Sequence, residues 1–396
     1  MEFTTSKVHL TYLLSSAAIL ASVTFIPIYG DSIGLSKSSI TTIVAFYSFF
    51  AFLGSFISGR MSDFKGRKII IIIGLISSAI TFTGQFFANS ELTLLIIRVL
   101  AGLSAGIAPP VLIAYAYELK YKMGSFSSFG SFGWGIGTVT AGEIALLFSS
   151  QYVFLLSGFF FFLSFVIALK FPKEEKIEED ALRDLGANLP VSHENSLKIF
   201  LRNLPVYIPL FMRHSAASGV WTLWPLFLKD VLSFNDGQIG LVQGTNALTQ
   251  FAVMWLLTDH LPADKSFELG LLMSGITFLS FLITSNFYLF LLTQVLLGFS
   301  WSNNYVGAVI KINESNPDGR GTATGFLTAI ISVSGLVGPV YAYVFLFYFN
   351  EIDIYYVLII FAALMSFSAF LIHFIYRLIS NRKKKPFFDR QIVKSF

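Results

Sequence analysis

The chain has 396 residues, of which 55% are hydrophobic, 16% aromatic and only 13% charged. Because soluble domains carry about 25% charged residues, this composition excludes an ordinary soluble domain and indicates a membrane protein. The net charge of +4 is too small to favour nucleic acid as a partner, and a chain without cysteine has no disulfide and no thiolate metal site.

Apolar runs close to the length of about 20 residues that crosses a bilayer recur along the chain. They predict an all-α membrane protein with twelve transmembrane helices, near residues 8–29, 39–58, 69–88, 92–116, 124–148, 152–171, 205–228, 238–258, 267–286, 287–310, 321–347 and 354–376. The first run is too long for the core of a signal peptide and lacks a small-residue cleavage pattern, so we expect it to be retained.

Positive charge is distributed unevenly between the two sides of this arrangement. Of the 27 Lys and Arg, all fall on the side of the chain termini except Lys37 and Lys229, on the opposite side, and Arg98 and Arg213, inside spans. The positive-inside rule then places both termini in the cytoplasm and predicts a multi-pass protein of the cell membrane.

The longest polar connection, residues 172–203, divides the predicted spans six and six. It is too short for a second domain, so we expect a cytoplasmic linker. Residues 1–171 are expected to form an N-terminal six-helix bundle, residues 204–378 a C-terminal six-helix bundle, and residues 379–396 a basic cytoplasmic tail.

The two halves resemble each other at a nearly constant spacing. Residues in the first half correspond to residues about 196 to 198 positions later: Pro27 to Pro225, Asp63 to Asp259, Gly102 to Gly298 and Glu118 to Glu314. Internal repeats of this kind predict two pseudo-symmetric bundles around a central path, with a solute site between them near the bilayer midplane.

A charged loop follows the second run and reads Gly59-Arg60-Met61-Ser62-Asp63-Phe64-Lys65-Gly66-Arg67-Lys68. It resembles the loop signature of the major facilitator superfamily, G-x-x-x-D-[RK]-x-G-[RK]-[RK], with Phe64 in place of a base. The resemblance implies the major facilitator fold and a cytoplasmic conformational latch formed by Gly59, Asp63, Gly66, Arg67, Lys68 and Glu118. The other interpretation is a topology anchor, which explains the bases but not the acids.

The fourth run contains Arg98, Gly102 and Gly106, which resemble the R-x-x-x-G-x-x-x-G signature of the same family. Glycines four residues apart allow helix backbones to approach closely, so we expect these two to pack against a neighbouring helix. An arginine inside a span is costly and needs a partner or water, or its side chain extends to the membrane surface. A functional role for Arg98 and a structural one both remain open.

The fifth run resembles an antiporter signature of this family, G-x8-G-x3-G-P-x2-G-G, in degenerate form. The matching positions are Gly124, Gly133, Gly137 and Gly142, while Thr138 and Ala141 replace a proline and a glycine. Glu143 follows directly and is the only carboxylate well inside any predicted span.

Arg98 and Glu143 lie at a similar predicted depth, so we expect them to form an ion pair. Burial favours a neutral acid and a neighbouring arginine favours a carboxylate, so a small movement could switch the protonation of Glu143. We interpret the pair as a proton-coupling site, with a static structural pair as the alternative. His214 is a second candidate proton carrier, or else a packed histidine.

Polar and aromatic residues lie on shared faces of three predicted helices in the second half. Polar groups inside a bilayer must face protein or water, so we expect them to line the central cavity. They are Arg213, His214, Trp221, Trp224, Gln243, Asn246, Gln294, Trp301, Asn304 and Tyr305. Taken singly, hydrogen bonding between helices is the alternative. As a set they suggest an amphiphilic organic solute.

No enzymatic constellation is present: His193-Glu194 does not continue as H-E-x-x-H, and no phosphate-binding loop with its lysine occurs. We expect a secondary active transporter similar to the twelve-span drug or metabolite proton antiporters. It is expected to be a monomer in the lipid bilayer, without a cofactor and powered by a proton gradient. The alternatives are proton-coupled uptake of a small organic anion or sugar, and a transport-silent receptor or scaffold.

Overall fold

In the computed structural model, the described residues are 2–119, 121, 123–172, 196–256, 261–316 and 320–384, and these ranges contain helices and no strand. The first half consists of α1 (Glu2–Ser32), α2 (Lys37–Lys65), α3 (Arg67–Gly84), η1 (Gln85–Phe87), α4 (Glu91–Ala105), α5 (Ala108–Glu118), α6 (Met123–Leu147), η2 (Ser150–Tyr152) and α7 (Val153–Ala168). Because α4 and α5 together form one span, this half has the six predicted spans.

The second half consists of α9 (Ser196–Leu226), η3 (Phe227–Val231), α10 (Asp236–Leu256), α11 (Ala263–Ser280), α12 (Phe287–Ser315), α13 (Arg320–Phe345) and α14 (Asp353–Lys384). Within the described ranges, the predicted all-α fold with twelve spans is therefore confirmed. α9 begins at Ser196 rather than near 205, within the range predicted as linker, and the rest of that linker lies mostly outside the described residues. α14 likewise extends past 376 to Lys384, into the predicted tail.

The fourth span is broken into α4 and α5 at Gly106 and Ile107, which form a turn. Pro109 and Pro110 follow in the first turn of α5. Proline has no backbone N–H to donate to the preceding turn, but it fits the first positions of a helix, where that N–H has no partner. The two prolines therefore end α4 and begin α5 at this point.

Glycines hold α4 tightly against α2, as predicted for Gly102 and Gly106. A Cβ on Gly102 would lie 2.4 Å from the carbonyl oxygen of Tyr47, and one on Gly106 would lie 2.1 Å from that of Ala51. On α2, Gly54 makes the reciprocal contact: a Cβ there would lie 2.2 Å from the carbonyl oxygen of Leu103. Any larger residue at these positions would force the two helices apart.

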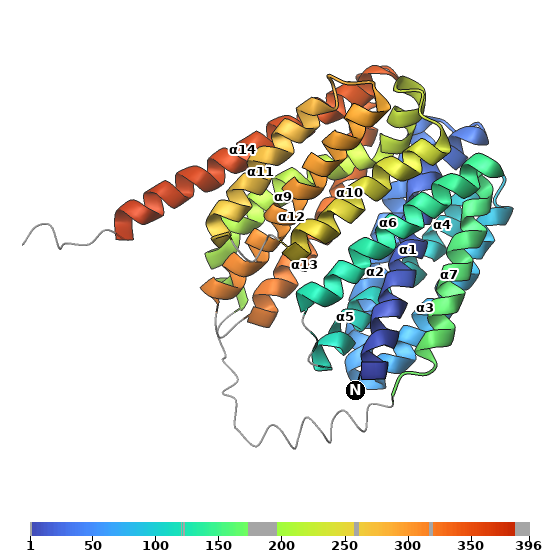
Figure 1. Cartoon of the computed structure of the whole chain (residues 1–396), viewed down its shortest axis with the longest axis horizontal. Coiled ribbons are helices and arrows are strands. Elements are labelled where there is room, and N and C mark those ends of the chain that lie inside the picture. The colour runs from blue at the N-terminus through green and yellow to red at the C-terminus, as the bar shows by residue number, and fades with distance from the viewer. Residues whose placement is uncertain are drawn as a thin grey trace, which may run out of the picture.

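The two bundles converge at one end of the molecule, which we call the far side because it lies opposite the start of α1 and the end of α14 (Figure 1). Lys37, at the start of α2, contacts Glu351, just before α14, so the start of α14 lies on the far side. The start of α1 and the end of α14 therefore share the other side, which we call the terminus side.

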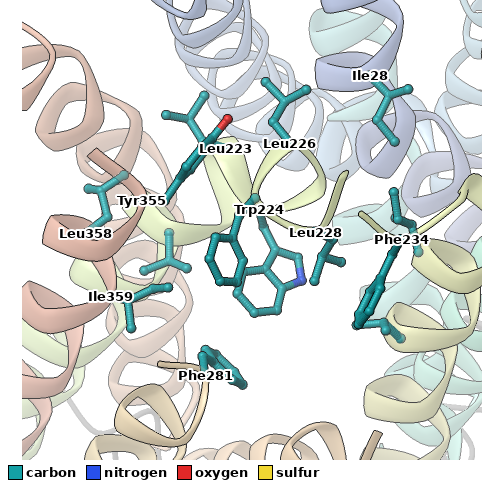
Figure 2. Close-up of a cluster of buried hydrophobic side chains, with 14 of the residues drawn as sticks. Ile28, Leu223, Trp224, Leu226, Leu228, Phe234, Phe281, Tyr355, Leu358 and Ile359 are labelled. Atoms are coloured by element: carbon teal, nitrogen blue, oxygen red, sulfur yellow. The ribbon is translucent and has the colours of Figure 1, made fainter. Parts of the chain in front are cut away.

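The buried apolar residues show how the bundles are joined. On the far side, one cluster contains residues of both bundles, including Phe25 and Ile28 of α1, Ala141 of α6 and Trp224 of α9. Figure 2 shows Ile28 of the first half beside the rings and aliphatic chains of the second. Toward the terminus side each bundle has its own cluster. Apolar packing therefore seals the far side, while the cores are separate toward the other end.

Candidate functional site

Arg98 is buried inside the N-terminal bundle, where its side chain is 1% exposed. One Nη donates hydrogen bonds to Gln85 Oε1 at 3.1 Å and to Ser22 Oγ at 3.3 Å. The guanidinium carbon lies 3.7 Å from the centre of the Tyr47 ring, a cation–π contact. Arg98 thus ties α4 to α1, α2 and η1, which excludes the interpretation that it extends to the membrane surface.

The predicted ion pair between Arg98 and Glu143 is absent from the described side chains, and this prediction is wrong. Glu143 is an exposed residue of α6 that faces the other bundle, where a Cβ on Gly237 would lie 3.4 Å from Glu143 Oε1. Equal depth along two helices does not specify their rotation about their axes. That rotation turns Arg98 into its own bundle and Glu143 toward α10.

The glycine-rich face of α6 makes close backbone contacts on two sides. Gly133 and Gly137 lie against α1, where added Cβ atoms would come within 2.1 Å of Leu13 and 2.3 Å of Ala17 carbonyl oxygens. Gly142 lies against α10, where an added Cβ would come within 2.8 Å of the Cα of Gly240. The degenerate antiporter signature therefore positions α6 between its own bundle and the opposite one.

Four of the predicted cavity residues come together midway along α9 and α12, and we call them the aromatic column. The His214 ring stacks on Trp301 with centroids 4.7 Å apart, and Trp301 stacks on Tyr305 at 5.7 Å. Arg213 lies over Trp301 with its guanidinium carbon 4.9 Å from the ring centre, and its Nε donates to Ser274 Oγ at 2.9 Å.

The column combines partly exposed rings with unsatisfied polar groups. His214, Trp301 and Tyr305 are half-buried, whereas Arg213 is 2% exposed. His214 Nδ1 and one Nη of Arg213 are buried without a hydrogen-bond partner. No carboxylate lies within ion-pair distance of Arg213 among the described side chains. A buried cation with a free donor favours a neutral or anionic group beside it.

Of the four predicted cavity residues with amide side chains, three are buried and one is half-buried. Asn246 and Gln294 are buried, and the Asn246 amide oxygen accepts from Gln250 at 3.1 Å. Asn304 is fully buried against α11, where a Cβ on Gly270 would lie 2.2 Å from the Asn304 nitrogen. Among the described side chains, these three do not show the hydrogen bonds between helices that the alternative predicts: Asn246 and Gln294 bond within α10 and α12, and the buried Asn304 side-chain amide has no hydrogen-bond partner. Gln243 is half-buried on α10.

Trp224 does not lie with the aromatic column. It is 1% exposed and packs against Phe281 at 4.7 Å and Phe227 at 5.4 Å between ring centroids (Figure 2). We therefore correct its assignment from cavity to aromatic core, since its neighbours on all sides are rings and aliphatic chains. Trp221, one turn earlier on α9, is half-buried and meets Trp224 edge-on at 5.3 Å.

The predicted latch loop lies on the terminus side, between α2 and α3. Gly66 separates the helices with φ +88° and ψ 144°, a conformation essentially restricted to glycine. Arg67 donates to Ser62 Oγ, and Lys68 donates to the Phe171 carbonyl. The side chains of Asp63 and Glu118 lie outside those described, as does the burial of Gly59, so the latch itself stays a prediction.

A buried charged network on the terminus side was missed by sequence reasoning. Glu268 of α11 is 7% exposed; its carboxylate contacts Arg377 Nη2 at 2.7 Å and His373 Nδ1 at 3.1 Å. Asp264 accepts from Lys311 at 2.8 Å. The available signal was the spacing of four between Asp264 and Glu268 and between His373 and Arg377, which places each pair on one helix face. Glu268, not Glu143, is the more buried carboxylate.

Comparisons with known proteins agree with this architecture. The sequence profile of the Major Facilitator Superfamily matches residues 8–219 and 206–392. The multidrug resistance protein MdtG of Proteus mirabilis (strain HI4320) is 28% identical over 285 residues, covering 65% of this chain and 68% of that protein. The multi-drug resistance efflux pump PmrA of Streptococcus pneumoniae serotype 4 (strain ATCC BAA-334 / TIGR4) is 26% identical over 348 residues, covering 82% and 85%.

Two solved structures share the fold at low sequence identity. The nucleoside transporter NupG superimposes with a TM-score of 0.74 at 10% identity over 93% of this chain and 98% of NupG. A bacterial homologue of the human lysosomal transporter Spinster, described as inward-facing and unoccupied, gives 0.72 at 15% identity over 94% and 96%.

Twelve membrane-spanning helical segments in two related bundles, counted over the described residues, define with the family match a membrane transport protein rather than an enzyme. The chain belongs to the Major Facilitator Superfamily. PmrA is named an efflux pump and NupG a nucleoside transporter, and secondary transport is the activity that this family membership supports.

Proposed function

We propose that the protein exports a small organic solute across the cell membrane in exchange for protons, as a monomer with both termini in the cytoplasm. The names of MdtG and PmrA support export of drug-like solutes. The concentration of Lys and Arg on the terminus side supports the orientation, because positive loops stay in the cytoplasm. The far side is then extracellular.

The observation that carries the proposal is the position of the aromatic column below a one-sided seal. Both bundles share one apolar cluster on the far side, while their cores are separate toward the terminus side. His214, Trp301 and Tyr305 are half-buried beneath that seal. Rings that remain partly exposed inside a membrane protein can stack on a flat solute arriving from the cytoplasm.

We assign Glu143 the role of proton carrier, now with α10 as its partner in place of Arg98. Its carboxylate lies beside Gly237 in the first turn of α10, where the helix carries a partial positive charge. Opening of the far side would move this helix end away from Glu143 and remove the positive charge that favours its carboxylate. A group that loses its charge partner in one of two conformations meets a requirement for coupling.

The loop between α2 and α3 would stabilise the opposite conformation, in which the terminus side is closed and the far side is open. Closure of the terminus side would bring Asp63, Arg67 and Glu118 against the start of α13, whose N-terminal end attracts an acid. The loop support is in place, because Gly66 provides the sharp turn between α2 and α3. Asp63→Asn should then slow transport with little loss of solute binding.

Reconstituted transport tests the proposal. We would purify the protein into liposomes and load them with a planar fluorescent carboxylate, fluorescein, or a cationic dye, ethidium. A pH difference is then imposed in either direction across the membrane. Proton-coupled export requires solute movement against the direction of proton flow. Glu143→Gln should abolish this pH-driven movement while leaving solute exchange without a gradient.

Three outcomes would contradict parts of the proposal. Movement in the same direction as protons would support the uptake alternative. Full pH-driven accumulation by Glu143→Gln would assign Glu143 a structural role and direct the search to His214. Tight binding of a dye with no movement under any gradient would favour a transport-silent receptor.

A further inference from the structure

Ion pairs join the two bundles on the far side, in a crossed arrangement. Lys229 donates to Asp31 Oδ2 at 2.7 Å, and Lys37 lies 3.5 Å from Asp230 Oδ2. The first bundle thus offers an acid at the end of α1 and a base at the start of α2. The second offers a base and an acid at successive positions of η3, so each bundle presents both signs of charge to the other.

Asp31 and Lys229 occupy equivalent positions of the two sequence repeats. The spacing of 198 that relates Pro27 to Pro225 also relates Asp31 to Lys229. Equivalent positions of two related halves meet each other only near the axis that relates them. Identical residues there would bring two like charges together, whereas the two halves carry opposite charges at this position.

Lys37 lies in a cage of second-bundle residues, among the side chains described, and its own side chain is only 12% exposed. Its Nζ contacts the Glu351 carboxylate at 3.3 Å and the Glu351 carbonyl at 3.2 Å, and it lies 4.9 Å from the centre of the Tyr355 ring. The Tyr355 hydroxyl donates to Asp230 at 2.7 Å and holds that carboxylate in place. Because the Lys37 side chain is largely removed from water, its ion pair with Asp230 should be stronger than a fully exposed pair.

The Asp31–Lys229 pair is more open to solvent, with side chains 38% and 39% exposed. A hollow of about 470 Å³ adjoins Lys229 and is lined by residues of both bundles, among them Ser32, Gln151 and Asp236. Dissolved ions therefore reach this pair from the far side. Salt should weaken it more than it weakens the Lys37 cage.

An irregular backbone presents the two charges of the second bundle. Lys229 and Asp230 belong to η3, a five-residue π-helical turn that follows Pro225, and Ser233 just beyond has φ +56°. A π-turn rotates successive side chains differently from an α-helix, so Lys229 reaches α1 while Asp230 reaches α2. Irregular turns of this kind often mark functional positions.

We propose that Asp31, Lys37, Lys229, Asp230 and Glu351 form an outer latch that sets the share of time the far side stays closed. Each of these ion pairs joins a residue of one bundle to a residue of the other, so the pairs exist only when the far side is closed. Opening must break them together with the apolar seal beneath. This goes beyond the proposed transport activity, because it concerns the conformational equilibrium and not the solute or the coupling ion.

Distance measurements between spin labels test the latch. The chain has no cysteine, so Glu91→Cys on α4 and Ser285→Cys before α12 provide labels on the far side of opposite bundles without background. Lys229→Asp should raise the ratio of long to short distances by about twofold to fivefold, as for other partly exposed pairs. Asp31→Lys should do the same, and the swapped double variant should restore the original ratio.

Asp353→Asn is the matched control, because this far-side carboxylate bonds Asn350 within its own bundle and should leave the ratio unchanged. Lys229→Gln replaces Lys229→Asp if the latter fails to fold. Unchanged distances in the single variants, or a folded swap variant that stays open, would overturn the proposal. The measurement uses no solute and no pH gradient, so its outcome is independent of the outcome of the transport test.

Discussion

Gly142 of α6 and Gly240 of α10 bring the backbones of the two bundles into direct contact. A Cβ on either glycine would lie 2.8 Å from the Cα of the other. The contact is on the far side, close to Glu143, so it belongs to the surface that must separate when that side opens. Its closeness makes the closed arrangement sensitive to a single methyl group.

Gly142→Ala should therefore shift the far side toward the open arrangement and reduce transport, since the added carbon meets backbone that cannot rotate away. Gly335→Ala on α13 is the control, because nothing lies within 4 Å of its added carbon. Both effects can be read from far-side label distances and from transport rates in liposomes. An equal response of the two variants would show that the glycine contact does not control closure.

Arg98 and Glu143 should differ in their effect on stability. Arg98→Leu removes one of the two donors to Gln85 Oε1, the other being Ser22 Oγ, together with the contact on the Tyr47 ring, and should lower the free energy of unfolding by about 2–4 kcal/mol. Glu143→Gln should change it by no more than about 0.5 kcal/mol, because the carboxylate is exposed. Thermal unfolding in detergent compares them. Matching losses in both variants would indicate that the two residues are coupled after all.

The buried network around Glu268 should stabilise the C-terminal bundle. Glu268→Ala leaves Arg377 and His373 without their shared partner and should cost about 3 kcal/mol. Lys311→Ala breaks a half-exposed pair with Asp264 and should cost no more than about 1 kcal/mol. The order of the two thermal midpoints is the measurement. A reversed order would place the stabilising contact at Asp264.

Gly66 should tolerate no side chain. Its φ of +88° with ψ of 144° is essentially restricted to glycine, so Gly66→Ala and Gly66→Asn should each cost about 1–3 kcal/mol. Asparagine should not rescue, because the left-handed helical region that it accepts has a much smaller ψ. If Gly66→Asn unfolds at the wild-type temperature, the α2–α3 turn adopts another conformation in solution.

Neutral or anionic solutes should be preferred to lipophilic cations. Arg213 has a free buried donor and no carboxylate partner among the described side chains, so Arg213→Gln should raise the KM for a planar carboxylate by about tenfold. Trp224→Phe, a change within the aromatic core, should leave this selectivity unaltered. Protection of the purified protein against heat by quaternary ammonium dyes, but not by organic acids, would refute the preference.

The sequence alone predicted the number of spans, the pseudo-symmetry of the two halves and the packing role of Gly102 and Gly106. These depend on bilayer thickness, on repeat spacing and on the absence of a Cβ, which are properties of the chain itself. The restriction of Lys37 and Lys229 to one side was also visible, although its consequence was not.

The tertiary structure decided which side chains meet. The depth of Arg98 could be counted along its helix, but its partners Ser22, Gln85 and Tyr47 depend on how three other segments are rotated around it. For the same reason two tryptophans, which are chemically identical, lie in different surroundings. Trp224 packs in an apolar core, whereas Trp301 belongs to the aromatic column. Rotation about a helix axis is set by packing with its neighbours, and inside a membrane most faces of a helix are equally apolar.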